Sequence, residues 1–150
     1  QNRQITKNYI AYVHGQIMKN STINQPISRH KTNRKKMAVN IGGKEAITSY
    51  EVLENFKFFT KLKINLLTGR THQIRVHMNY IGYPIVGDQI YGLNSNKCKS
   101  PSDFVKKFPR QALHAKKLEF MHPFSKKKLT LASQVPKDLF NLHSEISKDE

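Results

Sequence analysis

The sequence has few acidic side chains, and this shortage limits the kinds of partner that the chain can have. Only 10 of its 150 residues are Asp or Glu, against 26 Lys or Arg, and the net charge is +16. So large an imbalance favours a polyanionic partner. Nucleic acid fits better than a membrane surface, because the chain has no basic amphipathic helix of useful length. We therefore expect it to bind nucleic acid.

Cysteine and long apolar runs are also scarce. The one cysteine, Cys98, cannot form an internal disulfide or a zinc cage, and we interpret it as an incidental thiol in a reducing compartment. No apolar run approaches the roughly 20 residues that cross a bilayer. The opening stretch, QNRQITKNYIAYVHG, does not have the pattern of a signal peptide. We expect a cytoplasmic protein without a membrane partner.

The apolar periodicity predicts a single α+β domain, with a mixed, mainly antiparallel β-sheet flanked by a few helices. In strand 56–66, Phe and aliphatic residues share one parity and mainly Lys the other, so one face should be buried and the other wet and basic. Residues 37–39 can rejoin a sheet. Other predicted elements are strands at 9–15 and 46–53, a hairpin of 113–120 with 129–133, a helical turn at 103–107 and a helix at 136–146.

A helix is predicted over HQIRVHMNYI, residues 72–81. Thr71 can cap its start, Gly82 suits a left-handed end and Pro84 prevents its continuation. Arg75 falls close to the apolar stripe of this helix, where burial is costly without a carboxylate or phosphate partner. From position alone, a solvated Arg75 and a buried, paired Arg75 are equally good interpretations.

Polar groups also gather just before this helix. Arg70 follows the end of a strand, and Thr71, His72 and Gln73 offer hydrogen bonds at a helix N-terminus, where phosphates bind well. Asp88, in GDQIYG, is best explained as a turn residue.

Two other kinds of site fit the sequence poorly. His72 and His77 are five residues apart, so on a helix they point in different directions, and no histidine cluster with acids or cysteines suggests a metal site. The glycines of IGGKEA, residues 41–46, precede a lysine but lack the spacing of a phosphate-binding loop, so a plain turn is the better interpretation.

The order of these motifs resembles a known family. TGRTHQIRVH followed by GYPIVGDQIYG is similar to the signature segment of the RluA-type pseudouridine synthases, and KNYIAYVHG resembles the family's KxYxAxVxG strand. The resemblance continues through ISRHKTNRKKMAVNIGGKEAITSYEVLE, RQALHAKKLEFMHPF and PKDL, and covers roughly residues 7–140. Within the family, the ISRH segment favours the branch that acts on ribosomal RNA.

The resemblance implies an isomerase that converts uridine to pseudouridine in RNA without a cofactor or metal. A catalytic aspartate attacks the nucleotide, whose base is flipped out of its stack, detaches, rotates and rejoins through carbon 5. By resemblance, Tyr9 stacks on the base and removes the carbon-5 proton, and Arg75 pairs with the aspartate. RNA-binding residues are expected in the basic run RHKTNRKK and before the helix: Arg34, Lys35, Arg70, Thr71, His72 and Gln73.

The chain departs from the family at the nucleophile. The family's aspartate lies in an HRLDxxTSG motif upstream of the KxY strand, and this motif does not occur here. We therefore expect residues 1–150 to be the C-terminal portion of a catalytic domain, inactive alone, whose partner is a missing N-terminal part of the same protein. Arg75 should then lack an internal partner, and sheet edges should be exposed.

Two alternatives stay open. One is a pseudouridine synthase that acts on transfer RNA. The other is a basic RNA-binding module without catalysis, which would use the basic face of strand 56–66, the run at 29–36 and the lysines near 116–128.

Overall fold

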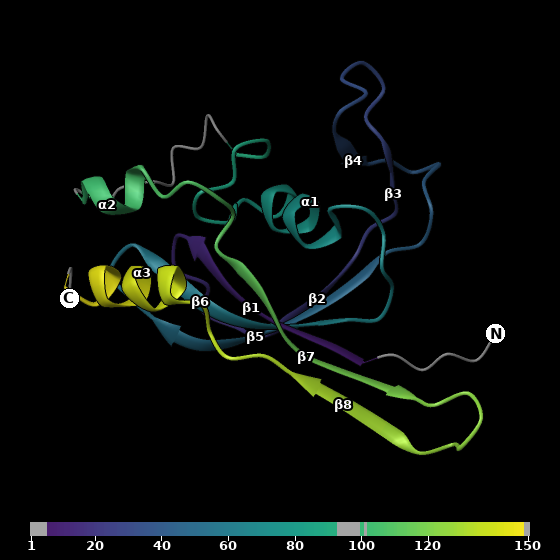
Figure 1. Cartoon of the computed structure of the whole chain (residues 1–150). Helices are drawn as coiled ribbons and strands as arrows, with labels where there is room; N and C mark the ends of the chain where they lie inside the picture. Colours follow the sequence, from purple (N-terminus) through teal and green to yellow (C-terminus); the bar gives the residue numbers. More distant parts are fainter. Residues whose placement is uncertain (1–5, 93–99, 101, 149–150) are drawn as a thin grey trace.

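The chain forms one mixed α+β structure, seen in a computed structural model that describes residues 6–92, 100 and 102–148. A six-stranded antiparallel sheet has the order β2-β5-β6-β1-β7-β8 (Figure 1). Its strands are β1 (Thr6–His14), β2 (Ser21–Asn24), β5 (Ile47–Asn55), β6 (Phe59–Leu66), β7 (Leu113–Met121) and β8 (Lys128–Ala132). The predicted fold class is confirmed, and Cys98 lies outside the described residues.

The core lies on both faces of the sheet. Strands β1 and β6 pair in a register that places Ala11 opposite Leu62, so alternate apolar side chains share a face. Helix α1 (Gln73–Tyr80) covers the face that carries Tyr9, Ala11 and Val13, and its His77 is bonded to Thr48 of β5. Helix α3 (Lys137–Ser147) covers the other face, where its His143 bonds the Tyr12 hydroxyl at 2.7 Å.

The β3–β4 hairpin projects beyond α1 (Figure 1). It consists of β3 (Ile27–Arg29) and β4 (Met37–Val39), which form a separate two-stranded sheet. Residues 37–39 are therefore a strand in a sheet, as expected, and this sheet is separate from the main one. The basic residues 30–36 lie in the connection between the two strands.

Two details of the predicted elements were wrong. Strand β6 begins at Phe59, and adjacent Phe59 and Thr60 are both buried, so the alternation of buried and half-buried residues starts only at Thr60. Its supposedly wet, basic face is half-buried, and Glu54 and Glu51 stand opposite Lys61 and Lys63 in the register. Opposite charges in register stabilise the sheet and make this face a weaker candidate for RNA.

The remaining helices and the terminal hairpin follow the prediction. The turn at 103–107 is helix α2 (Asp103–Lys106), and Pro136 precedes α3. The hairpin β7–β8 extends away from the body of the molecule (Figure 1), and every residue of the edge strand β8 is exposed. That another part of the protein covers this edge stays a prediction.

Candidate functional site

Arg75 has an internal partner, which corrects the expectation of an unpaired charge. Its Nε and Nη2 each lie 2.9 Å from one oxygen of Asp88, so the guanidinium and the carboxylate form a bidentate pair. The side chains are 11% and 1% exposed. Burial by itself opposes ionisation of Asp88, but Arg75 and two backbone N–H groups outweigh it and lower the carboxyl pKa. The pair is therefore ionised at neutral pH.

A tight turn places Asp88 under the helix. Asp88 Oδ1 accepts hydrogen bonds from the backbone N–H groups of Ile90 (2.9 Å) and Tyr91 (3.0 Å). Gly87 precedes it with φ of +79°, a left-handed conformation that glycine adopts without a Cβ penalty. The expected turn role of Asp88 is thus present, and the same carboxylate also binds Arg75. The sequence did not indicate that Asp88 pairs with Arg75, because the two residues lie thirteen positions apart.

Tyr91 connects Arg75 to the β3–β4 hairpin. The Arg75 guanidinium carbon lies 5.2 Å from the centre of the Tyr91 ring, within the range of a cation–π contact. The Tyr91 hydroxyl accepts a hydrogen bond from the Met37 backbone N–H at 2.9 Å and lies 2.9 Å from His72 Nδ1. Burial, together with the nearby Arg75 charge, lowers the pKa of His72, so its neutral ring can accept from the tyrosine. One aromatic residue thus holds β4, α1 and Arg75 together.

The Gln73 side chain makes its hydrogen bonds within the fold, which argues against its predicted contact with RNA. Its Oε1 accepts from the Thr68 hydroxyl and the Arg70 backbone N–H, and its Nε2 donates to the Ile47 carbonyl and the Thr48 hydroxyl. All four bonds are 3.0 Å or shorter, and the residue is 2% exposed. The amide has no capacity left for another ligand.

The N-terminus of α1 differs from the prediction. His72 occupies the cap position in a left-handed conformation with φ of 56°, and neither it nor Thr71 bonds the first turn through its side chain. The Thr71 side chain does not cap the helix, and it lines a cleft together with Arg70. The left-handed Gly82, φ +90°, ends the helix region as expected.

Tyr9 lies in β1, half-buried on the sheet face that α1 covers. It lines a second cleft with Lys7 and the inner part of the β7–β8 hairpin. Burial raises the pKa of its phenol, so the hydroxyl is protonated at neutral pH and would have to lose its proton before it could accept one from carbon 5. Among the hydrogen bonds, ion pairs and ring contacts of the described residues, none joins Tyr9 to Arg75.

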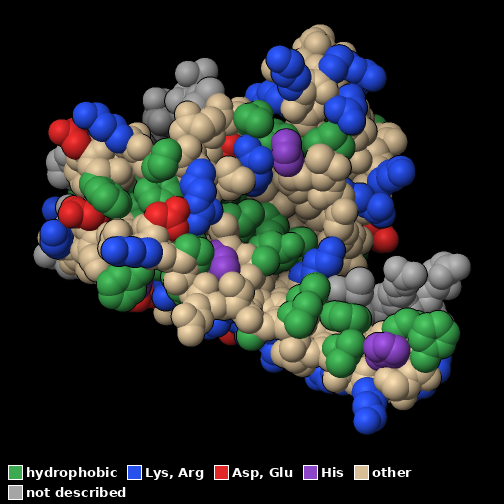
Figure 2. All heavy atoms as spheres, in the orientation of Figure 1, with side chains coloured by type: hydrophobic (Ala, Val, Ile, Leu, Met, Phe, Trp, Pro, Cys, Tyr) green, Lys and Arg blue, Asp and Glu red, His purple; other side chains and the backbone are tan. Residues whose placement is uncertain are grey.

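The predicted basic residues are on the surface. Arg34 and Lys35 are exposed between β3 and β4, in a region where Figure 2 shows Lys and Arg side chains gathered. Arg70 is half-buried and donates from Nε to the Glu45 carbonyl at 2.7 Å. Within residues 6–92, 100 and 102–148, no group of three metal-ligating side chains occurs, and none of the helices described there is long and apolar enough to cross a membrane.

His77 makes the fold sensitive to acid. It is fully buried, with Nδ1 2.7 Å from the Thr48 hydroxyl and Nε2 2.8 Å from the Gln25 carbonyl. Burial lowers its pKa, and burial also lowers the pKa of His14 from 6.5 to about 4. Both rings are therefore neutral in the folded chain and readily protonated in the unfolded one.

We expect stability to be full above pH 6.5 and to fall as the pH decreases from there toward 4. The sign follows because the unfolded state binds more protons in this window. Thermal melts across the range would measure it. His14→Phe should flatten the decrease, since buried His14 Nδ1 has no hydrogen-bond partner and the ring packs on Phe59. A midpoint that is constant from pH 7 to 5 would contradict this role of the histidines.

Comparison with known proteins identifies the family of this chain. The family model of RNA pseudouridylate synthases matches residues 1–80, more than half of the chain, and the chain belongs to this family. Ribosomal large subunit pseudouridine synthase D of Salmonella typhimurium is 44% identical over 93% of this chain and 44% of its own length. The protein of the same name from Haemophilus influenzae is 42% identical over 99% of this chain and 47% of its own length.

Solved structures show the same fold. Human RNA Pseudouridylate Synthase Domain Containing 1 superposes with a TM-score of 0.72 and 29% identity, over 89% of this chain and 56% of that one. A second human protein, RNA Pseudouridylate Synthase Domain Containing 4, has a TM-score of 0.68 at 24% identity and supports the fold alone. The chain spans about half the length of the curated relatives it matches.

Proposed function

We propose that this chain is part of an enzyme that isomerises uridine to pseudouridine in large-subunit ribosomal RNA, in the cytoplasm. The observation that carries the proposal is the 44% identity, over 93% of the chain, to a protein named for that reaction. In the reaction the bond from ribose C1′ to N1 breaks, the base rotates, and a bond from C1′ to C5 forms. The proton leaves C5, and N1 gains one, so no other reactant is needed.

We propose that the attacking aspartate lies outside these 150 residues. Asp88 is a poor candidate, because Arg75 and two backbone N–H groups occupy its oxygens and its side chain is 1% exposed. Asp138 is paired with Arg110 at 2.7 Å, Asp103 belongs to the first turn of α2, and Asp149 lies outside the described residues. The roughly twofold greater length of the relatives leaves room for a further segment.

Arg75 can still serve such a nucleophile. A guanidinium has five N–H donors, and Asp88 takes two of them. Asp88 and the Tyr91 ring fix the plane of Arg75, so the remaining donors keep a set direction toward an incoming carboxylate. In this proposal Arg75 orients the nucleophile and keeps it ionised, while Asp88 positions Arg75.

Tritium release from RNA labelled at carbon 5 of uridine tests the reaction. The complete protein should release tritium from large-subunit RNA and not from transfer RNA, and the isolated 150-residue chain should release none. Release by a folded chain of 150 residues would show that one of its own acids is the nucleophile. Binding without release by the complete protein would favour the non-catalytic RNA-binding module.

Tyr9→Phe in the complete protein tests the proposed proton removal. The phenylalanine ring keeps the stacking surface but lacks the hydroxyl, so turnover should fall about 100-fold or more while RNA affinity changes little. Tyr80→Phe is the matched control, since Tyr80 is 55% exposed at the end of α1. Full turnover in Tyr9→Phe would rule out the hydroxyl as the base.

A further inference from the structure

A basic cleft lies between the β3–β4 hairpin and the chain that leads into α1. It has a volume of about 580 Å³, and its lining includes Ile27, Arg29, Met37, Gly43, Lys44 and Arg70. Three of these side chains are cationic and none is acidic. The volume is in the range of sites that hold one small ligand.

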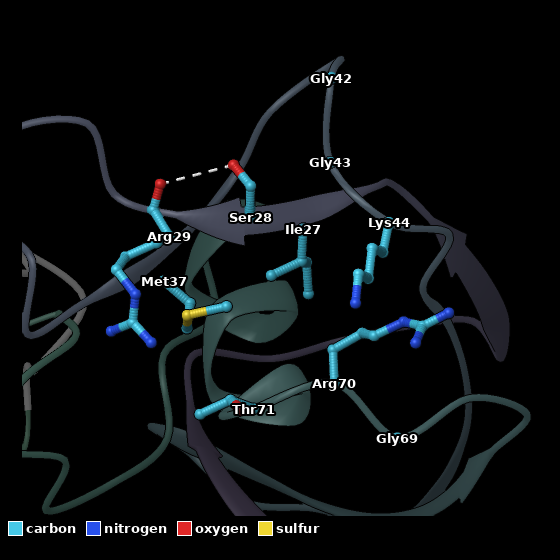
Figure 3. A pocket seen from close by; sticks show the side chains of 10 residues that line it. All are labelled: Ile27, Ser28, Arg29, Met37, Gly42, Gly43, Lys44, Gly69, Arg70 and Thr71. Atoms are coloured by element: carbon cyan, nitrogen blue, oxygen red, sulfur yellow. Dashed lines mark hydrogen bonds between the residues drawn. The ribbon is translucent and has the colours of Figure 1, made fainter.

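The three cations come from different segments and are not neutralised. Figure 3 shows Arg29 on β3, Lys44 after the glycine turn and Arg70 on the opposite wall. Arg29 Nη1 donates to the Arg34 carbonyl at 2.8 Å, and Arg70 Nε donates to the Glu45 carbonyl at 2.7 Å. These bonds orient the guanidinium groups without cancelling their charge. No hydrogen bond or ion pair among the described residues uses Lys44 Nζ.

The floor of the cleft is apolar and well fixed. Buried Ile27 and half-buried Met37 face it across the β3–β4 pair. A Cβ on Gly43 would lie 2.8 Å from the Ile27 backbone nitrogen, so only glycine allows the turn to approach β3 this closely. An apolar floor beside cationic side chains suits a ligand with one apolar face and one negative group, as a nucleotide has.

A lysine connects this cleft to Tyr9. A Cβ on Gly69 would lie 3.3 Å from Lys7 Nζ, and Lys7 lines the second cleft together with Tyr9. Positive charge therefore continues from Arg70 past Lys7 to the proposed target site. Such a line of positive charge suits the backbone of a single RNA strand.

We propose that the cleft binds one unpaired nucleotide of the substrate RNA, distinct from the target uridine. Its phosphate contacts Lys44 on the side of the cleft where Arg70 lies, and its base lies toward Met37, with Arg29 at the other end of the cleft (Figure 3). The inference rests on the proposed function for the identity of the ligand as RNA. A duplex does not fit, because its bases are stacked and paired and cannot reach a concave floor.

The salt dependence of RNA affinity tests this assignment without any need for turnover. The probe is a short, mixed-sequence single-stranded RNA, measured with the protein by fluorescence anisotropy at several salt concentrations. Lys44→Gln should weaken binding about fivefold and reduce the slope of log affinity against log salt by about 0.7, the value for one single-strand phosphate. Lys137→Gln, an exposed lysine on α3, should leave the slope unchanged.

Met37→Glu provides the second measurement of RNA affinity and its salt slope. It places a negative charge on the floor of the cleft and should abolish the contribution of Lys44 to RNA binding. Adding Lys44→Gln to this variant should then change neither the affinity nor the slope. An unchanged slope in Lys44→Gln would overturn the phosphate site. A duplex RNA bound as tightly, with a slope change of about 0.9, would overturn the unpaired nucleotide. If the complete protein released no tritium while these binding results held, the proposed function alone would be contradicted.

Discussion

Asp88→Asn should destabilise the chain by about 3–5 kcal/mol, the cost of leaving a buried charge without its partner. The amide retains an acceptor for the backbone N–H groups of Ile90 and Tyr91, so the turn can persist. Arg75, however, keeps a charge at 9% exposure with no carboxylate beside it. For a domain of this size the thermal midpoint should fall by roughly 10 °C, which calorimetry or circular dichroism would measure.

A second substitution separates the charge from the packing. Arg75→Met combined with Asp88→Asn removes both charges and keeps an apolar chain of similar length beside Tyr91. The double variant should regain much of the lost stability, since a buried pair can often be replaced by apolar groups at little cost. If Asp88→Asn alone costs under about 1 kcal/mol, Arg75 finds another partner or water, and Asp88 is not its anchor.

Gly87→Ala should be among the most damaging single-methyl changes in the protein. A Cβ there would overlap the Arg110 carbonyl oxygen and lie 2.9 Å from Phe108 Cδ2, in addition to the strain of an alanine at φ of +79°. We expect a loss of about 4 kcal/mol or more, because a backbone oxygen cannot move aside as a side chain can. Denaturant unfolding would measure it.

Gly82→Ala is the matched control. Gly82 has a similar φ of +90°, but a Cβ there would meet no atom within 4 Å. Only the backbone strain applies, so the loss should be about 1 kcal/mol. Equal losses at both positions would show that conformation, and not the close approach to Arg110, limits residue 87.

Gly87 and Asp88 matter for the proposed reaction because they fix the position of Arg75. Gly87 brings the turn against the Arg110 backbone, Asp88 fixes the guanidinium, and Tyr91 joins it to β4. The basic connection between β3 and β4 is therefore attached to the residue proposed to orient the nucleophile. A ligand that displaces β4 would act on Arg75 through one hydrogen bond and one ring.

Local patterns in the sequence indicated most of the secondary structure and the family, but they did not indicate β2 and β3. Alternating parity found β6, the Gly82–Pro84 signal found the end of α1, and the ordered run from TGRTHQIRVH to GDQIYG pointed to the RNA pseudouridylate synthases. Each of these signals depends on neighbours within a few residues, so it can be read without three-dimensional contacts. The excess of basic residues likewise follows from composition alone.

The tertiary structure decided which polar groups are already in use. From its position in the sequence, Arg75 could be either solvated or paired, and only the fold shows that the turn at 87–91 supplies Asp88 as its partner. Gln73 has the same surroundings in sequence as Arg70 and Thr71, yet β5, Thr68 and the Arg70 backbone take all of its hydrogen bonds. The basic cleft also depends on the fold, since Arg29, Lys44 and Arg70 line one cleft only when the β3–β4 hairpin packs beside α1. Hydrogen bonds and ion pairs between distant segments leave no periodic trace in a sequence, and here they determine which residues remain available to RNA.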